Sequence, residues 1–173
     1  MQKIGRSHSF NLLIMACNCK NGETFVNTLV PVPGATADAA SYVLDLTHYL
    51  CGNRKVCATS AFPIAATLNY QVLSVDEVGK GVYNANIFVT GQISYKPYRN
   101  GNCSCGCEDN CYRSDNVWVS LSVPVTTADI PTITPGICKC AAANLRDCCN
   151  VSNAVSVTTS FLVESPAAAQ GGD

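Results

Sequence analysis

The sequence predicts an all-β protein, an antiparallel β-sandwich of the immunoglobulin-like or jelly-roll type. Along several segments rich in Val, Ile and Thr, apolar and polar side chains alternate with a period of two, as half-buried strands require. Turns rich in Gly and Pro separate these segments. The best helical candidate is about one turn around Ala141–Arg146, so alternating β and α units are not expected.

One domain is expected, because 173 residues with 47% hydrophobic side chains suffice for a single core of sandwich size. We place an N-terminal arm or leader at residues 1–23, the sandwich at 24–165 and a flexible tail at 166–173. Six strands are predicted in chain order, at Thr24–Val32, Ala40–Leu50, Leu68–Val78, Val82–Tyr95, Val117–Thr126 and Ala154–Glu164. A further strand is predicted at Ile130–Ile137.

The first two predicted strands are defined by a turn and by a shared apolar face. The first strand ends at Pro31 and the Pro-Gly turn at 33–34, because proline lacks the N–H that a strand ladder needs. In the second strand, His48 falls on the same face as Leu44 and Leu46, since residues two apart point the same way. His48 is therefore expected to be a half-buried, hydrogen-bonded strand residue.

The third and fourth predicted strands form a long hairpin. Gly79-Lys80-Gly81 joins them, and glycine adopts the positive φ of a tight turn without steric cost. In the fifth strand apolar residues alternate with polar ones, and Pro124 predicts a sheet edge or a bulge because proline cannot donate to a ladder. The sixth strand alternates in the same way.

The charge content is low. Charged residues make up 13% of the chain and the formal net charge is -1, which argues against a cationic nucleic-acid face. A surface with few charges and many small β-forming residues is typical of a subunit that neighbouring subunits cover. No run approaches the roughly 20 apolar residues that span a bilayer, so no membrane span is expected.

Two interpretations of the N-terminus remain open. In one, residues 1–16 are a short leader and Ile14-Met15-Ala16-Cys17 is a poor lipoprotein cleavage box that would leave Cys17 lipidated. In the other, Met15 is the true initiator and the preceding residues are an upstream extension.

Twelve cysteines fall in four groups between the predicted strands, and every one is a candidate for a disulfide or a metal ligand: Cys17, Cys19, Cys51, Cys57, Cys103, Cys105, Cys107, Cys111, Cys138, Cys140, Cys148 and Cys149. Because successive antiparallel strands send alternate loops to alternate ends, we expect the Cys-rich loops to gather mainly at one end of the sandwich.

The cysteine chemistry has several open alternatives. Adjacent Cys-x-Cys residues seldom bond to each other, because a disulfide across so short a ring is strained, so bonds to other loops are one alternative. A structural Zn²⁺ held by several thiolates is the second, although the paired Cys-x₂-Cys knuckle is absent. Free thiols are the third, and Cys17 and Cys19 could also cross-link neighbouring subunits. No other cofactor is expected.

No catalytic residues are predicted, and the protein is not expected to be an enzyme. Only two histidines are present, His8 and His48, and no phosphate loop, nucleophile elbow or dinucleotide fingerprint occurs. The carboxylates are scattered without a facing acid pair. An aromatic and cationic patch could form from four aromatic residues that lie close to Lys96, Arg99 and Arg113, but core or interface packing is the better interpretation. The four are Tyr95, Tyr98, Tyr112 and Trp118.

These observations predict a non-enzymatic structural subunit of a larger assembly, in the first place a virion protein such as a capsid decoration, head or tail protein. Its partners would be copies of itself and other structural proteins, with no nucleic acid and no small-molecule substrate. A secreted or lipid-anchored binding module, or an extracellular appendage subunit at the cell surface, is the alternative. A metal-handling or redox protein is a third hypothesis, which exchangeable thiols would support.

Overall fold

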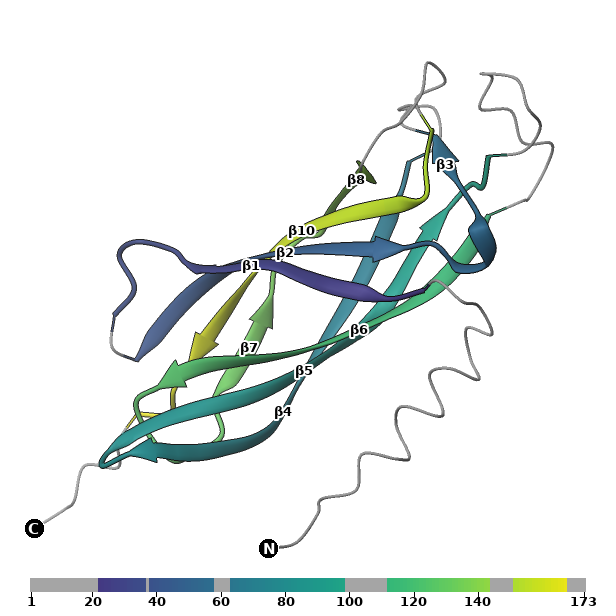
Figure 1. Cartoon of the computed structure of the whole chain (residues 1–173). Helices are drawn as coiled ribbons and strands as arrows, with labels where there is room; N and C mark the ends of the chain where they lie inside the picture. Colours follow the sequence, from purple (N-terminus) through teal and green to yellow (C-terminus); the bar gives the residue numbers. More distant parts are fainter. Residues whose placement is uncertain (1–21, 37, 58–62, 99–111, 144–150, 168–173) are drawn as a thin grey trace, which may run out of the picture.

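The computed structural model describes residues 22–36, 38–57, 63–98, 112–143 and 151–167. Over these residues the chain forms antiparallel strands and one 3₁₀ turn, η1 (Cys51–Asn53), and no α-helix (Figure 1). The predicted all-β class is therefore confirmed. The arm at 1–23, the tail at 166–173 and most of the Cys-rich loops lie largely outside the described residues.

One sheet has five strands (Figure 1). Its central pair is β2 (Ala39–Tyr49) and β10 (Ala154–Glu164), and β1 (Thr24–Pro31) pairs with the free side of β2. On the other side of β10 lie two short strands in succession, β7 (Thr132–Pro135) and β8 (Lys139–Ala143). β1 is thus one edge of the five-stranded sheet.

The second sheet is a three-stranded meander of β4 (Ala65–Gly79), β5 (Val82–Tyr95) and β6 (Arg113–Val125). The β4–β5 hairpin turns at Gly81, whose φ of 72° favours glycine, and the Gly81 N–H donates to Glu77 Oε1 at 2.9 Å. A third, two-stranded sheet joins β3 (Val56–Cys57) to β9 (Val151–Ser152).

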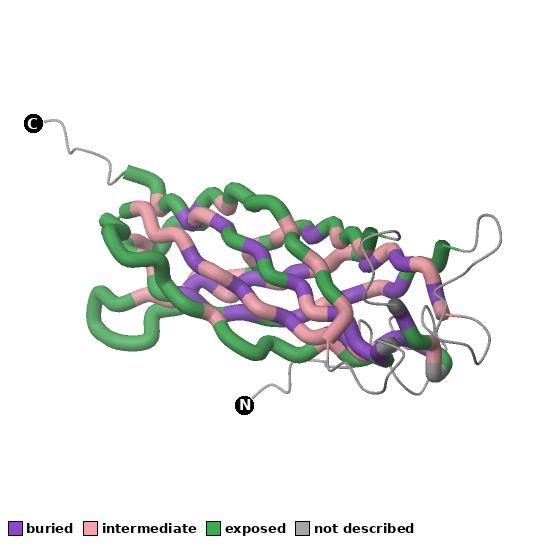
Figure 2. The backbone as a smooth tube through the Cα atoms, turned by 90° about the horizontal axis from the view of Figure 1, so that it is seen from above, coloured by how far each residue is buried: buried purple, intermediate pink, exposed green. Residues whose placement is uncertain are grey.

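The two larger sheets face each other across one core, a sandwich-like architecture (Figure 2). The long strands β2, β5, β6 and β10 send alternate residues into it, as the period-two pattern predicts, whereas β1 is largely exposed. Phe161 of β10 stacks on Tyr42 of β2 and meets Tyr70 of β4 from the opposite sheet, with ring centroids 5.5 and 5.0 Å apart. The largest fully buried apolar side chains are Tyr95, Phe161, Leu44, Leu46, Leu50, Ile87 and Ile93.

Most predicted strands are confirmed. Val82–Tyr95 and Ala154–Glu164 match β5 and β10, the other four differ only at their ends, and the extra strand predicted at Ile130–Ile137 contains β7. Pro124 lies on β6, which among the described strands pairs with β5 alone and so is an edge of its sheet, one of the two positions that the proline predicted.

The best helical candidate of the sequence, about one turn around Ala141–Arg146, is not helical over its first three residues. Ala141 to Ala143 belong to β8, where Ala142 packs against the core and pairs with Val155. Pairing with β10 and burial outweigh the helical preference of alanine, which is a weak local preference. The remaining residues of that prediction lie outside the described part of the chain.

The strand order differs from the immunoglobulin order, in which non-consecutive strands share each sheet through Greek-key connections. Here β4, β5 and β6 are consecutive and form a simple meander, and β10 returns to lie beside β2. No described strand lies beside β4 in the three-stranded sheet, as the fourth strand of a Greek key would. Hydrophobic alternation decides which face a strand buries but carries no information on its neighbours.

Candidate functional site

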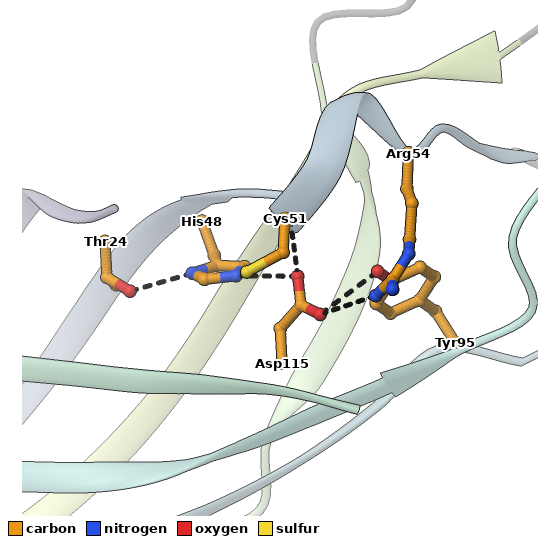
Figure 3. Close-up of polar contacts among 6 residues, drawn as sticks. All are labelled: Thr24, His48, Cys51, Arg54, Tyr95 and Asp115. Atoms are coloured by element: carbon orange, nitrogen blue, oxygen red, sulfur yellow. Dashed lines mark hydrogen bonds and ion pairs between the residues drawn. The ribbon is translucent and has the colours of Figure 1, made fainter. Parts of the chain in front are cut away.

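A cluster of polar side chains lies between the two larger sheets, beside η1 (Figure 3). Asp115 comes from β6, Tyr95 from β5, His48 from β2 and Thr24 from β1, while the loop that follows β2 adds the backbone of Cys51 and the side chain of Arg54. The alternation along β6 sends Asp115 inward, because it shares a face with Val117 and Val119. We call these six residues the polar cluster.

Asp115 is the centre of the polar cluster. Its Oδ2 accepts hydrogen bonds from the Cys51 N–H at 2.8 Å and from His48 Nε2 at 3.2 Å. Its Oδ1 accepts from the Tyr95 hydroxyl at 3.2 Å and lies 3.6 Å from Arg54 Nη1. With 2% of its surface exposed, the carboxylate needs these partners, since a buried charge without hydrogen bonds is strongly unfavourable.

His48 connects the carboxylate to the edge of the five-stranded sheet. Because a carboxylate can only accept, Nε2 carries the proton that is donated to Asp115, and in the neutral ring Nδ1 accepts from the Thr24 hydroxyl, 2.9 Å away. The imidazole is completely buried. The chain from Thr24 through His48 to Asp115 thus crosses from β1 and β2 to β6 and connects the two sheets.

The surroundings of Asp115 favour its charged form. Burial alone would raise the pKa of this carboxyl, but the hydrogen bonds from His48 and from the Cys51 N–H outweigh burial and hold its pKa below the ordinary value. Burial raises the pKa of the Tyr95 phenol to about 12, so Tyr95 stays protonated and donates to the carboxylate at neutral pH.

A hydroxyl, an imidazole and a carboxylate in hydrogen-bonded series is also the arrangement of a hydrolytic triad. Two features make the polar cluster unsuited to that chemistry. The imidazole has no exposed surface through which to meet a substrate, and the carboxylate is shared among the Cys51 N–H, Tyr95 and Arg54 as well as His48. What the arrangement does is fix the relative position of the two sheets and of η1.

The cysteines predicted as cross-links are only partly within the described residues. Cys51 is buried and disulfide-bonded, and Cys57 lies in β3, where its backbone pairs with Val151. Cys138 and Cys140 carry free thiols; burial, with the Cys138 thiol nearby, raises the pKa of Cys140 to about 11. The other eight lie outside the described residues: Cys17, Cys19, Cys103, Cys105, Cys107, Cys111, Cys148 and Cys149. Their predicted gathering at one end stays a prediction.

His48 is a hydrogen-bonded strand residue, as predicted, although it is fully rather than half buried. The aromatic and cationic patch does not form as one unit. Tyr95 is in the core, Trp118 lies against Phe88, and the Lys96 ammonium lies 5.2 Å from the ring centre of Tyr112.

Asp115 was missed at the sequence level, although a signal was present. It lies two residues before Val117, in register with the apolar face of the predicted fifth strand. An acid in phase with an apolar face is itself evidence of a buried, partnered carboxylate. The partners could not be identified, because Thr24, His48 and Tyr95 are distant in sequence.

Comparison with protein-family models, with curated protein sequences and with solved structures finds no match. Within the residues that the structure describes, no three or more His, Cys, Asp or Glu side chains are grouped as metal ligands. No helix in the same part of the chain is long and apolar enough to cross a membrane.

Proposed function

We propose that this protein is a non-enzymatic structural subunit of a larger assembly, in the first place a virion protein such as a capsid decoration, head or tail protein. The observation that carries the proposal is the edge strand β1. On one side β1 pairs with β2, and its other side pairs with no described strand. A free edge of this kind is a template for contact with another chain.

The side chains of β1 and of the residue that follows it suit burial in such a contact. Phe25, Val26, Val30 and Val32 are 47%, 39%, 51% and 37% exposed, and no residue from Thr24 to Pro31 is charged. Natural edge strands usually carry charges that discourage association. We infer that the neighbour is a second copy of this chain or another protein of the assembly, which would cover these apolar side chains.

The cysteines fit the same role. The disulfide of Cys51 lies within the chain and supports covalent stabilisation of the single subunit. For the cysteines outside the described residues, both disulfides and a structural Zn²⁺ remain part of the proposal. The non-enzymatic assignment is supported by the burial of His48 and Asp115, whose polar atoms are occupied by contacts within the fold.

A secreted or lipid-anchored binding module, or an appendage subunit, is the second candidate. The specific observation in its favour is the outer face of the three-stranded sheet, where Phe88 and Trp118 lie together at the centre of a polar surface. Its ligand is the subject of the next subsection.

The test of the assembly proposal is sedimentation of the full chain over a wide concentration range, with Val30→Lys as the disrupting variant. Val78, which is 59% exposed near the β4–β5 turn, provides the matched control Val78→Lys. We expect the wild type and Val78→Lys to associate and Val30→Lys to remain monomeric. A wild type that is monomeric at every concentration, or equal association of the two variants, would contradict the role of β1.

Intact mass without reductant, before and after a chelator, separates the two cysteine chemistries. Disulfides lower the mass by the hydrogens lost and are insensitive to the chelator, whereas bound zinc is removed and leaves alkylatable thiols.

A further inference from the structure

We propose that the outer face of the three-stranded sheet binds an uncharged glycan chain. This inference is independent of the assembly role proposed for β1, because it concerns the opposite sheet; it rests on the second candidate function, the binding module, and names its ligand. The face consists of the residues of β4, β5 and β6 that alternate with the buried ones, and its centre is formed by Thr67, Asn69, Gln71, Phe88, Thr90, Gln92, Asn116, Trp118 and Ser120. We call these nine residues the amide–aromatic face.

The position of these side chains follows from the register. Phe88 pairs with Gln71 on one side and Ser120 on the other, and Thr90 pairs with Asn69 and Trp118. Residues directly opposite each other across antiparallel strands project to the same face. Because Val89 on β5 is buried, its neighbours Phe88 and Thr90 project away from the core.

Two aromatic rings lie together at the centre of the amide–aromatic face. The ring centroids of Phe88 and Trp118 are 6.1 Å apart and the rings are inclined by 50°. Both are half-buried although they project from the solvent side of their strands. The broad face of an aromatic ring is the usual partner of the C–H face of a pyranose, since the ring carries negative charge on its face.

Side-chain amides flank the two rings. Asn69 and Gln71 lie on β4, Gln92 on β5 and Asn116 on β6, and Gln92 Nε2 donates to Asn116 Oδ1 at 3.3 Å. Each amide has two N–H donors and a carbonyl acceptor, so this one contact leaves further donors and acceptors for a ligand. Sugar hydroxyls both donate and accept, which matches amides better than it matches carboxylates or ammonium groups.

The charge on the face decides which ligand it fits. None of the nine residues of the amide–aromatic face is charged. The nearest acidic residue on the same side of the sheet is Asp76, which pairs with Asn84, closer to the β4–β5 turn. Nucleic acids and other polymers with many phosphates are bound mainly through Lys and Arg, which this face lacks. Protein interfaces concentrate Arg and aromatic residues and are depleted in Ser. A surface of aromatic rings, amides and hydroxyls without charge fits a neutral polysaccharide.

The size of the face fits a chain rather than a single sugar. Successive outward residues on one strand are about 7 Å apart and neighbouring strands about 5 Å apart. The three rows of the amide–aromatic face therefore cover the length of several linked sugars.

Trp118 is the one tryptophan of the chain, so its fluorescence reports directly on the site. The full chain is titrated with soluble neutral polysaccharides (a β-glucan, a mannan, a xylan, a starch dextrin and chitin oligosaccharides) and with two acidic ones, polygalacturonate and heparin. We expect at least one neutral glycan to shift Trp118 emission saturably, and the acidic ones to have no effect.

Variants locate the binding. Trp118→Ala, followed by affinity electrophoresis in the active glycan, is expected to lower affinity at least tenfold, whereas Trp118→Phe keeps a ring and most of the affinity. Gln92→Ala is expected to lower affinity severalfold. The matched control is Tyr112→Ala, which removes an aromatic ring that is 43% exposed but lies outside the face.

Three outcomes would overturn the inference: no response of Trp118 to any neutral glycan, stronger binding of the acidic polymers, or equal affinity of Trp118→Ala and Tyr112→Ala. Circular dichroism of each variant verifies the fold, and Trp118→Phe with Gln92→Ala still decides the question if Trp118→Ala does not fold.

Discussion

Two parts of the interior connect the same pair of sheets by different means. Around Phe161 the contact is apolar, with Tyr42 from the same sheet and Tyr70 from the opposite one stacked on its ring. Around Asp115 the contact is polar, and a buried carboxylate receives donors from both sheets and from η1. The apolar part depends on shape and buried area, whereas the polar part depends on the protonation of individual groups.

Together the two parts give the fold both stability and a defined alignment of its sheets. Apolar packing is strong but tolerates small shifts, because the hydrophobic effect has no direction. Hydrogen bonds to one carboxylate specify distances and angles. The polar cluster lies where β2 runs into η1, so it also fixes the loop that carries Cys51.

Asp115→Ala is expected to have the largest effect on stability, about 3 to 5 kcal/mol at neutral pH, because it leaves buried donors from Cys51, His48 and Tyr95 without an acceptor. Denaturant unfolding measures the loss. Asp129→Ala, at an exposed carboxylate, is the control and should change stability by less than about 0.5 kcal/mol.

The stability difference between the wild type and Asp115→Ala should depend on pH. Since the folded pKa of Asp115 lies below its ordinary value of 3.8, its contribution is complete above that pH and is lost as the pH falls through the folded pKa. The difference between wild type and Asp115→Ala should therefore shrink in acid. A difference that stays constant from pH 7 down to the acid limit of folding would argue against a charged Asp115.

Phe161→Leu, in the apolar part, is expected to cost about 1 to 2 kcal/mol, because it removes both ring contacts while keeping much of the apolar volume. The loss should be the same at acid and neutral pH, since no titrating group of the polar cluster touches the ring. A pH-dependent loss would show that the two parts are coupled, and a double variant with Asp115→Ala would measure that coupling.

Tyr95→Phe is expected to have the smallest effect, about 1 kcal/mol at neutral pH, for the hydrogen bond to Asp115. Burial raises the pKa of Tyr95 to about 12 from an ordinary value of 10.0, so ionisation favours the unfolded chain between these values and stability falls as pH rises. Phenylalanine removes this contribution, and the alkaline decline should become shallower. An identical decline in both proteins would assign it to other groups.

Local chemistry predicted the strands well where it was strong. Val82–Tyr95 and Ala154–Glu164 alternate regularly, and both were predicted with their observed bounds. The Gly79-Lys80-Gly81 turn predicted the hairpin of β4 and β5. Local chemistry failed at β8, where three alanines have no alternation and only the pairing with β10 makes a strand. The candidate site was predicted only in part. His48 was identified because it is in phase with an apolar face of its strand, whereas Asp115, which has the same pattern, was missed.

The all-β class, the low charge and the inward or outward direction of side chains in the strongly alternating strands could be predicted from the sequence, because these depend on a residue and its near neighbours. Beyond the β4–β5 hairpin, the neighbours of each strand became known from the three-dimensional structure. It shows that Thr24, His48, Tyr95 and Asp115 meet inside and that Phe88 and Trp118 meet outside. Strand pairing depends on how the whole core packs, and the alternation of the individual strands is compatible with many different strand orders.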